Sequence, residues 1–254
     1  MFRRRHLTSA HNNMSQRSSE AREKQANLTH SRIEEVFGVR LRELEAKRLD
    51  KIVEEFSHGF YFLRDFGLAA TIFGSTRVKT EDRMYQEAVK LALMLAKEGF
   101  AIITGGGPGI MEAANKGASE AGGRSAGINI QLLRKQSTNK YVKESAAFSY
   151  FFIRKAMLAF ASEVYVFFPG GFGTLDELFE LTTLIQTKKI APIPIILVGR
   201  EYWTPLLAWI EQELYKKRGA IEKEDMKIHC LVDDAQGAFE YIQKTVHHKK
   251  FNRR

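Results

Sequence analysis

The chain has 254 residues, a formal net charge of +9 and a hydrophobic fraction of 44%, which predict one globular domain with a polar appendage rather than two full domains. Its single cysteine, Cys230, cannot form an internal disulfide, so nothing in the composition requires an oxidising compartment, and a cytoplasmic location is expected. Neither a secretory signal nor an apolar membrane span is predicted.

Residues 1–30 are basic and polar and predict a disordered, solvated tail. A transit peptide is also basic and Ser-rich, but Glu20 and Glu23 argue against one. The charged ends could attract nucleic acid or small anions. Aromatic side chains are not interleaved with these charges, as a surface for single-stranded nucleic acid requires, so solubilising ends are favoured and a nucleic-acid partner is not expected.

Residues 31–66 carry apolar side chains at helical spacing among alternating charges. This pattern predicts an N-terminal extension of one or two amphipathic helices, which Gly38 and Gly59 could interrupt.

Residues 67–248 alternate short apolar runs with amphipathic segments, a pattern typical of a parallel sheet covered by helices. We therefore expect an α/β fold, a Rossmann-like doubly wound parallel sheet with helices on both faces. The expected strands lie at 68–74, 100–107, 125–130, 164–171, 193–199 and 227–232, and the expected helices at 81–98, 110–121, 151–161, 175–187, 202–217 and 234–246.

Unusual residues follow the first, second and fourth of these strands, where an open α/β sheet binds its ligands. The segments are FGSTRVKTED from Phe73, TGGGPGIMEAANKG from Thr104 and PGGFGTLDE from Pro169. Glycines at a strand-to-helix junction let backbone N–H groups converge on an oxyanion. Tight turns would also use glycines, but their repetition in one sheet favours a phosphate site.

The class of phosphate ligand follows from patterns that the loops lack. The glycine spacing differs from the dinucleotide fingerprint, and no acid stands about twenty residues further on, which disfavours NAD. Neither loop has the pattern of a P-loop ATPase. A mononucleotide or a sugar phosphate remains.

Asp176 and Glu177 are expected in the first turn of the helix that follows PGGFGT. If Thr174 faces the ligand, helical spacing points Glu177 the same way and turns Asp176 aside. Upstream, an apolar helix is interrupted by Arg154 and Lys155, and its start should lie near the same edge of the sheet. Arg154 could then meet Glu177 across a nucleotide.

PGGFGTLDE and IRKAM resemble the PGGxGTxxE motif and the upstream Arg-Lys pair of the LONELY GUY family, phosphoribohydrolases often labelled lysine decarboxylases. The resemblance covers residues 68–246, and the first sixty or so residues resemble the longer bacterial branch. It implies a homodimer or larger symmetric homo-oligomer that hydrolyses the N-glycosidic bond of a nucleoside 5′-monophosphate, without metal ion or cofactor. Many relatives have an acid near Lys135 and Gln136, which this sequence lacks.

By this resemblance Arg154 and Glu177 match the catalytic pair. Lys155 and the loop residues Gly170, Gly171, Gly173 and Thr174 match nucleotide-binding positions, and Thr183 matches a further contact. We further expect substrate binding by Gly74, Ser75, Arg77, Gly105, Gly106, Gly107, Met111 and Met157.

Chemistry supports this role for Glu177, because a carboxylate beside the sugar stabilises an oxocarbenium-like state and can orient water. Arg154 is too basic for a general acid and is better suited to orienting Glu177 or the departing base. The alternative is a non-catalytic nucleotide sensor with the same pocket. Lysine decarboxylation would need a pyridoxal phosphate site, for which no constellation stands out. The sequence leaves open which base is preferred.

Overall fold

The computed structural model describes residues 43–131 and 138–251, with side chains described up to residue 246. The chain divides into two compact units, Met1–Glu54 and Glu55–Arg254. The described part of the first unit, residues 43–54, is helical. The predicted tail at residues 1–30, Gly38, and the loop with Lys135 and Gln136 lie outside the described residues. None of the described helices is long and apolar enough to cross a membrane.

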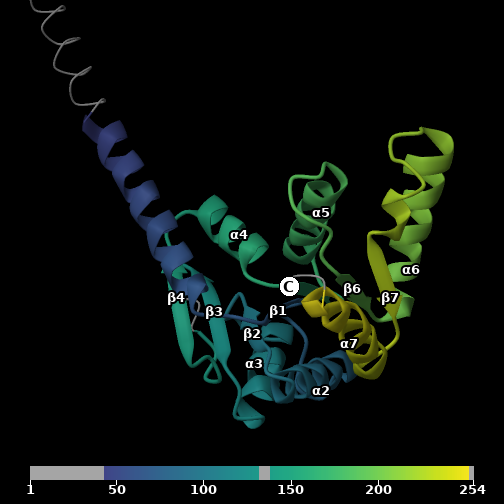
Figure 1. The fold of residues 1–254 in the computed structure, drawn as a ribbon, viewed down its shortest axis with the longest axis horizontal. Coiled ribbons are helices and arrows are strands. Elements are labelled where there is room, and N and C mark those ends of the chain that lie inside the picture. The colour runs from purple at the N-terminus through teal and green to yellow at the C-terminus, as the bar shows by residue number, and fades with distance from the viewer. Residues whose placement is uncertain (1–42, 132–137, 252–254) are drawn as a thin grey trace, which may run out of the picture. The chain divides into compact units, whose positions relative to one another are not determined.

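The second unit is built on a sheet of parallel strands in the order β4-β3-β2-β1-β5-β6-β7 (Figure 1). The strands are β1 (Ala69–Phe73), β2 (Ala101–Thr104), β3 (Ser125–Ile130), β4 (Glu144–Phe148), β5 (Val164–Phe167), β6 (Ile195–Val198) and β7 (His229–Val232). Each strand expected from the sequence is present, within a few residues of its predicted bounds.

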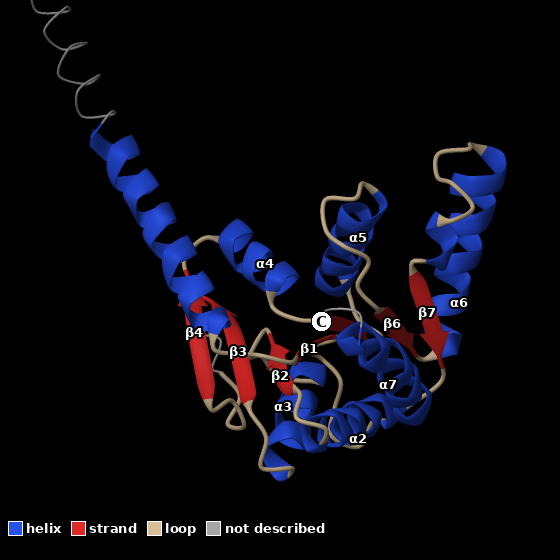
Figure 2. Ribbon diagram, in the orientation of Figure 1, coloured by secondary structure: helices blue, strands red, loops and turns tan. Residues whose placement is uncertain are grey.

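Helices cover both faces of this sheet, which confirms the doubly wound α/β fold (Figure 2). One face carries α2 (Arg83–Lys97), α3 (Ile110–Glu120) and α7 (Ala235–Phe251), and the other carries α4 (Phe151–Phe160), α5 (Phe172–Gln186) and α6 (Arg200–Trp209). The last of these continues as a wider π-helical segment, η1 (Ile210–Lys217), and a short 3-10 turn, η2 (Asp225–Lys227), precedes β7.

Strand β1 shows why the apolar runs form the centre of the sheet. All its residues are buried, and successive side chains point to opposite faces. Ala70 and Ile72 belong to the apolar cluster that packs on α2, α3 and α7. Phe73 instead stacks on Phe167, with ring centroids 4.8 Å apart. A strand covered on both faces needs apolar residues throughout, which is the pattern that the sequence shows.

Strand β4 was missed by the sequence analysis. It pairs with β3 from Ala126↔Glu144 to Ile130↔Phe148 and forms one edge of the sheet. Its sequence, ESAAF, lacks the β-branched residues typical of strands, and it alternates between buried and more exposed positions. The strand before PGGFGT is therefore the fifth along the chain and not the fourth.

Residues 55–64 of the second unit are helical without a break, so the expected interruption at Gly59 is wrong. The glycine serves close packing instead. A β-carbon there would lie 2.7 Å from Cγ of Met157 on α4 and 3.1 Å from the ring of Phe148 on β4. Without a side chain, the 55–64 helix can approach both elements.

The strand order reverses at β1, and this reversal places the functional site. The chain runs outward from β1 to β4 and then returns to pair β5 with the other side of β1. The connections at the carboxyl ends of β1 and β5 leave in opposite directions, which opens a crevice in such folds.

Candidate functional site

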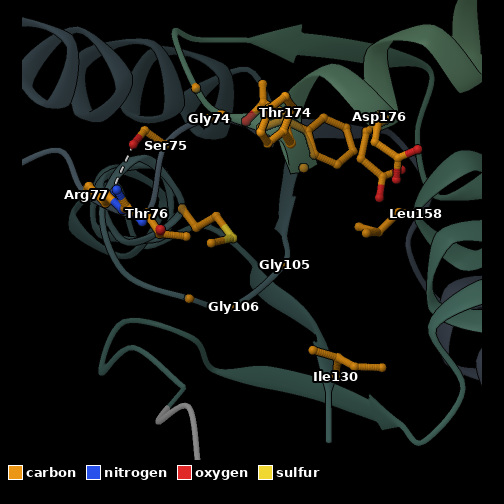
Figure 3. Close-up of a pocket in the computed structure, with 18 of the residues that line it drawn as sticks. Gly74, Ser75, Thr76, Arg77, Gly105, Gly106, Ile130, Leu158, Thr174 and Asp176 are labelled. Atoms are coloured by element: carbon orange, nitrogen blue, oxygen red, sulfur yellow. Dashed lines mark hydrogen bonds between the residues drawn. The ribbon is translucent and has the colours of Figure 1, made fainter. Parts of the chain in front are cut away.

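A cavity of about 910 Å³ lies at the carboxyl ends of the central strands. This volume is within the range of small-molecule sites, roughly 300–1,000 Å³. The cavity is lined by every residue that the sequence analysis assigned to the site except Lys155, Met157 and Thr183. Figure 3 shows residues of its walls, with Ser75 and Arg77 at the left and Thr174 and Asp176 further to the right.

The first wall is the turn after β1. The amide of Ser75 donates to the carbonyl of Pro169 at 3.0 Å, and its carbonyl accepts from the amide of Ile110 at 3.0 Å. The Ser75 hydroxyl accepts from the amide of Arg77 at 3.1 Å (Figure 3). A β-carbon at Gly74 would lie 2.7 Å from the Ile110 side chain. This turn therefore ties the two glycine loops together.

The second wall is the glycine loop between β2 and α3. Gly106 has φ +74°, a conformation that side chains rarely adopt, and a β-carbon there would collide with the amide oxygen of Asn129. A β-carbon at Gly105 would collide with the guanidinium of Arg154. The bare backbone is therefore what lets Arg154 lie across the floor of the cavity.

A buried polar network fixes this loop from below. Thr104 donates from its hydroxyl to the Asn115 amide oxygen at 2.7 Å and accepts from the amide of Gly106 at 2.9 Å. Asn139 donates to the same Asn115 oxygen at 2.9 Å and to the carbonyl of Gly107 at 3.0 Å. Thr104 and Asn115 are fully buried, so these hydrogen bonds satisfy side-chain polar groups that water does not reach.

The third wall is the PGGFGT loop. Helix α5 begins at Phe172, and its N-cap, Gly171, offers no side chain to cap the first turn. Such a turn presents unoccupied N–H groups and the positive end of the helix dipole to a ligand. Gly170 lies so close to Thr174 that a β-carbon would collide with the threonine hydroxyl. This wall is the best candidate for a phosphate site.

The early start of α5 corrects two expectations. Asp176 and Glu177 lie in the second turn, and no acid lies in the first, because α5 already begins at Phe172 and includes Gly173. The dipole therefore does less to favour the ionised carboxylates than expected. Asp176 does not turn away from the site but lines the cavity beside Glu177.

Arg154 and Glu177 form the charged centre of the cavity. Glu177 is 6% exposed, and burial raises its pKa to about 7, against the opposing effects of the Lys155 and Arg154 cations. Arg154 donates from Nε to the carbonyl of Ile128 on β3 at 2.8 Å. Burial lowers the pKa of Arg154 below its ordinary value, and the Glu177 carboxylate opposes this shift without reversing it. The site thus holds a carboxylate that can titrate near neutrality beside a fixed cation.

Lys155, Met157 and Thr183 do not line the cavity. The Lys155 ammonium lies 2.6 Å from Asp176 Oδ2 and 3.3 Å from Glu180 Oε2, which links α4 to α5. Met157 is buried against Gly59. The exposed Thr183 donates its hydroxyl to the Phe179 carbonyl, one turn earlier in α5, at 2.7 Å. Lys155 and Met157 thus contact neighbouring elements, whereas Thr183 bonds within its own helix.

The sequence analysis missed several residues of the cavity. Asn129 and Ile130 end β3, Thr138 is the first residue described after residue 131, and Tyr202 lies in the first turn of α6. Asn129 and Thr138 are joined by a hydrogen bond of 3.1 Å. The signal for Asn129 was available, because a polar residue at the end of a central parallel strand faces the ligand edge. The further lining residues missed are Phe73, Val78, Phe151, Leu158 and Phe172.

Across residues 43–131 and 138–251, no group of three or more His, Cys, Asp or Glu side chains is arranged to hold a metal ion. The cavity instead offers backbone N–H groups, hydroxyls, the amide of Asn129, two guanidinium groups (Arg77 and Arg154) and two carboxylates (Asp176 and Glu177).

Residues 111–242 match the family model described as "Possible lysine decarboxylase". An Arabidopsis thaliana protein named cytokinin riboside 5′-monophosphate phosphoribohydrolase LOG5 is 31% identical over 168 residues, 65% of this chain and 71% of the relative. The chain belongs to the LONELY GUY family. Against a rice member of the LONELY GUY family, named as a probable phosphoribohydrolase of the same substrate, it is 30% identical over 132 residues, which span 51% of this chain and about half, 53%, of the relative.

A solved structure shows the same fold as this LONELY GUY chain. The molybdenum cofactor carrier protein of Chlamydomonas reinhardtii superposes with a TM-score of 0.55 at 20% identity, over 71% of this chain and 98% of the carrier. At this identity the likeness concerns the fold alone.

Proposed function

We propose that the protein hydrolyses the N-glycosidic bond of a nucleoside 5′-monophosphate to a free base and ribose 5-phosphate. The observation that carries this proposal is the buried carboxylate of Glu177, which lines one cavity with Arg154 and with glycine loops suited to an anion. The names of the family relatives, phosphoribohydrolases of cytokinin riboside 5′-monophosphates, support the same reaction class.

In this reaction the 5′-phosphate binds at the start of α5, where its oxygens accept hydrogen bonds from the first-turn N–H groups. This anchor sets the ribose beside Glu177, three residues beyond Thr174. As the bond from C1′ to the base breaks, positive charge grows on the sugar, and the ionised carboxylate stabilises it. Water adds its hydroxyl to C1′, and its proton goes to the base nitrogen that leaves. Arg154 orients Glu177 or the departing base.

The test is a panel of nucleoside 5′-monophosphates, including AMP, GMP, pyrimidine nucleotides and a cytokinin riboside 5′-monophosphate, with released bases separated by chromatography. We expect base release from at least one nucleotide and not from its nucleoside at equal concentration. Equal rates on AMP and adenosine would show that the PGGFGT loop does not bind the 5′-phosphate. Glu177→Gln should bind nucleotide and lose most turnover. A protein that binds nucleotides with no base release would be a sensor.

The proposed partner in assembly is a second copy of the chain, as the family resemblance implies. Helices α4 and α5 expose Phe152, Phe160 and Phe172 at 50%, 57% and 93%, more aromatic surface than a monomer commonly leaves in water. We expect a dimer or larger symmetric oligomer, measured by light scattering on the full chain. A strict monomer at micromolar concentration would contradict this expectation. A chain starting near Arg64 tests whether the N-terminal helix contributes.

A further inference from the structure

The helix that carries Arg154 into the cavity is held at its start by a carboxylate from a distant part of the chain. Glu55 accepts the amide of Ser149 at 3.0 and 3.1 Å with its two oxygens, and the amide of Tyr150 at 3.2 Å. Tyr150 is the N-cap of α4 and provides no side-chain capping bond. In a capping box, a glutamate in the first turn accepts the backbone amide of the N-cap residue. Glu55 accepts this amide at the start of α4, although it belongs to another helix.

The 55–64 helix also packs along α4. The side chain of Met157 packs directly against Gly59, where a β-carbon would collide with the Met157 sulfur, so the two helices lie close together. On either side of this contact, Phe56 packs on Phe152 with ring centroids 6.4 Å apart, and Phe60 packs on Phe160 at 6.2 Å. These contacts reach both ends of α4, whose bounds are Phe151–Phe160, so the helix is fixed along its length.

The position of α4 matters because Arg154 has little freedom to compensate for a shift. Its Nε bonds to the Ile128 carbonyl at 2.8 Å, and its guanidinium lies against Gly105 in space that a single β-carbon would fill. A hydrogen bond weakens steeply when its geometry is lost, and displacements of about 1 Å in a catalytic group can cost about 100-fold in rate.

We propose that Glu55 and Gly59 are positioning residues for Arg154, so that the 55–64 helix, upstream of the nucleotide-binding sheet, is a working part of the active site. The inference rests on the proposed function for its kinetic consequence. The structural part of the inference, that Glu55 and Gly59 hold α4 in place, does not depend on that function, and hydrogen exchange measures it separately.

The first experiment is a double-mutant cycle in the full chain. Glu55→Gln keeps the shape but loses the charge that strengthens the bonds to Ser149 and Tyr150. We expect kcat to fall about tenfold with KM within about twofold, since the anchor on α5 is untouched. In the Arg154→Ala background, Glu55→Gln should change the residual rate by less than about twofold, because its effect acts through Arg154. Glu54→Gln, at the exposed neighbouring position, is the control and should match the wild type.

Gly59→Ala is the second variant, because it displaces Met157 without altering any charge. It should lower kcat in the same Arg154-dependent way. An unchanged kcat in both variants, or equal losses with and without Arg154, would overturn the proposal, since a merely destabilised fold lowers the rate in either background.

Hydrogen exchange separates failure of this proposal from failure of the proposed function. Glu55→Gln should speed exchange at the amides of Ser149, Tyr150 and the first turns of α4, and leave α5 unchanged. If the wild type releases no base from any nucleotide, the proposed reaction is wrong, and exchange alone decides the positioning. Unchanged protection of α4 in both variants would then refute it.

Discussion

The hydroxyl of Tyr202 donates a hydrogen bond of 2.5 Å to the carbonyl oxygen of Gly170. This bond joins the first turn of α6 to the loop that we assign to the 5′-phosphate. A second bond holds the loop one residue earlier, where the amide of Ser75 donates to the Pro169 carbonyl at 3.0 Å. The glycines of this loop would otherwise be free to adopt many conformations.

Tyr202→Phe should therefore raise KM for a nucleoside 5′-monophosphate about three- to tenfold, the effect of losing one ordinary hydrogen bond of about 1 kcal/mol, and leave kcat within about twofold. Steady-state kinetics on the best nucleotide check this. Tyr215→Phe, outside the cavity lining, is the matched control. A normal KM in Tyr202→Phe would show that the loop holds its shape without this bond.

Glu177→Gln should stabilise the protein at high pH. Burial raises the folded-state pKa of Glu177 from its ordinary 4.5 to about 7. The unfolded chain loses this proton near 4.5 and the folded chain near 7, so stability falls as pH rises through that window. Above pH 7 the ionised Glu177 should cost up to about 3 kcal/mol, which glutamine avoids.

Urea unfolding of the wild type and Glu177→Gln at pH 5 and pH 8 measures this difference. The variant should gain little at pH 5 and about 2–3 kcal/mol at pH 8. Glu98→Gln, at the exposed C-cap of α2 and outside the cavity lining, should show no such pH-dependent gain. Equal stability of wild type and Glu177→Gln at both pH values would mean that Glu177 ionises without cost.

Lys155 should control the pH at which the proposed hydrolysis begins. The positive charge of Lys155 lowers the pKa of the buried Glu177, and its ammonium lies 2.6 Å from Asp176 and 3.3 Å from Glu180. Lys155→Gln should raise the pKa of Glu177 and move the acid limb of the kcat profile to higher pH. Lys155→Arg keeps the charge and should leave the limb nearer its wild-type position. The exposed Lys90→Gln is the control, and an unmoved limb in Lys155→Gln would exclude this electrostatic role.

Asn115→Ala should destabilise the protein by about 2–4 kcal/mol, because it removes the hydrogen bonds that the buried Asn115 side chain makes with the hydroxyls of Thr104 and Ser125. KM should rise as well, since the network holds Gly106 and Gly107. Chemical unfolding and kinetics measure both effects. The adjacent Lys116→Ala, which removes an ion pair with Glu120 on the surface of α3, should change stability by less than about 0.5 kcal/mol.

The sequence predicted most of the central sheet and three walls of the cavity, because each of these features is formed by residues that are contiguous in the chain. A buried parallel strand needs an unbroken apolar run, and the loop that follows it comes next in the chain. Thus FAIIT followed by GGG sufficed to place Gly105–Gly107 at the ligand edge. Strand β4 lacked such a run, since its small side chains cover an edge and not the centre.

Contacts between distant segments could not be predicted in this way. Neither the bond from Glu55 to Ser149 nor the packing of Gly59 on Met157 has any local pattern, and a glycine in a polar helix is read more readily as a break. The position of Asp176 was misjudged for a local reason. The glycines of PGGFGT were taken as loop, although Phe172 already begins α5.

The central position of β1 has a consequence for the order in which the molecule can fold. Its neighbour β5 is paired through Ala70↔Val164, across a loop of the chain that contains β2, β3 and β4. As the chain leaves the ribosome, strands β1 to β4 are complete while one edge of β1 still has no partner, an arrangement prone to wrong pairing. Glu177 and the PGGFGT loop follow β5, so the cavity can close only after this long-range pairing, which is slow in parallel sheets. Recovery of nucleotide binding during refolding would thus time the last strand pairing at the centre of the sheet, later than the return of helical signal.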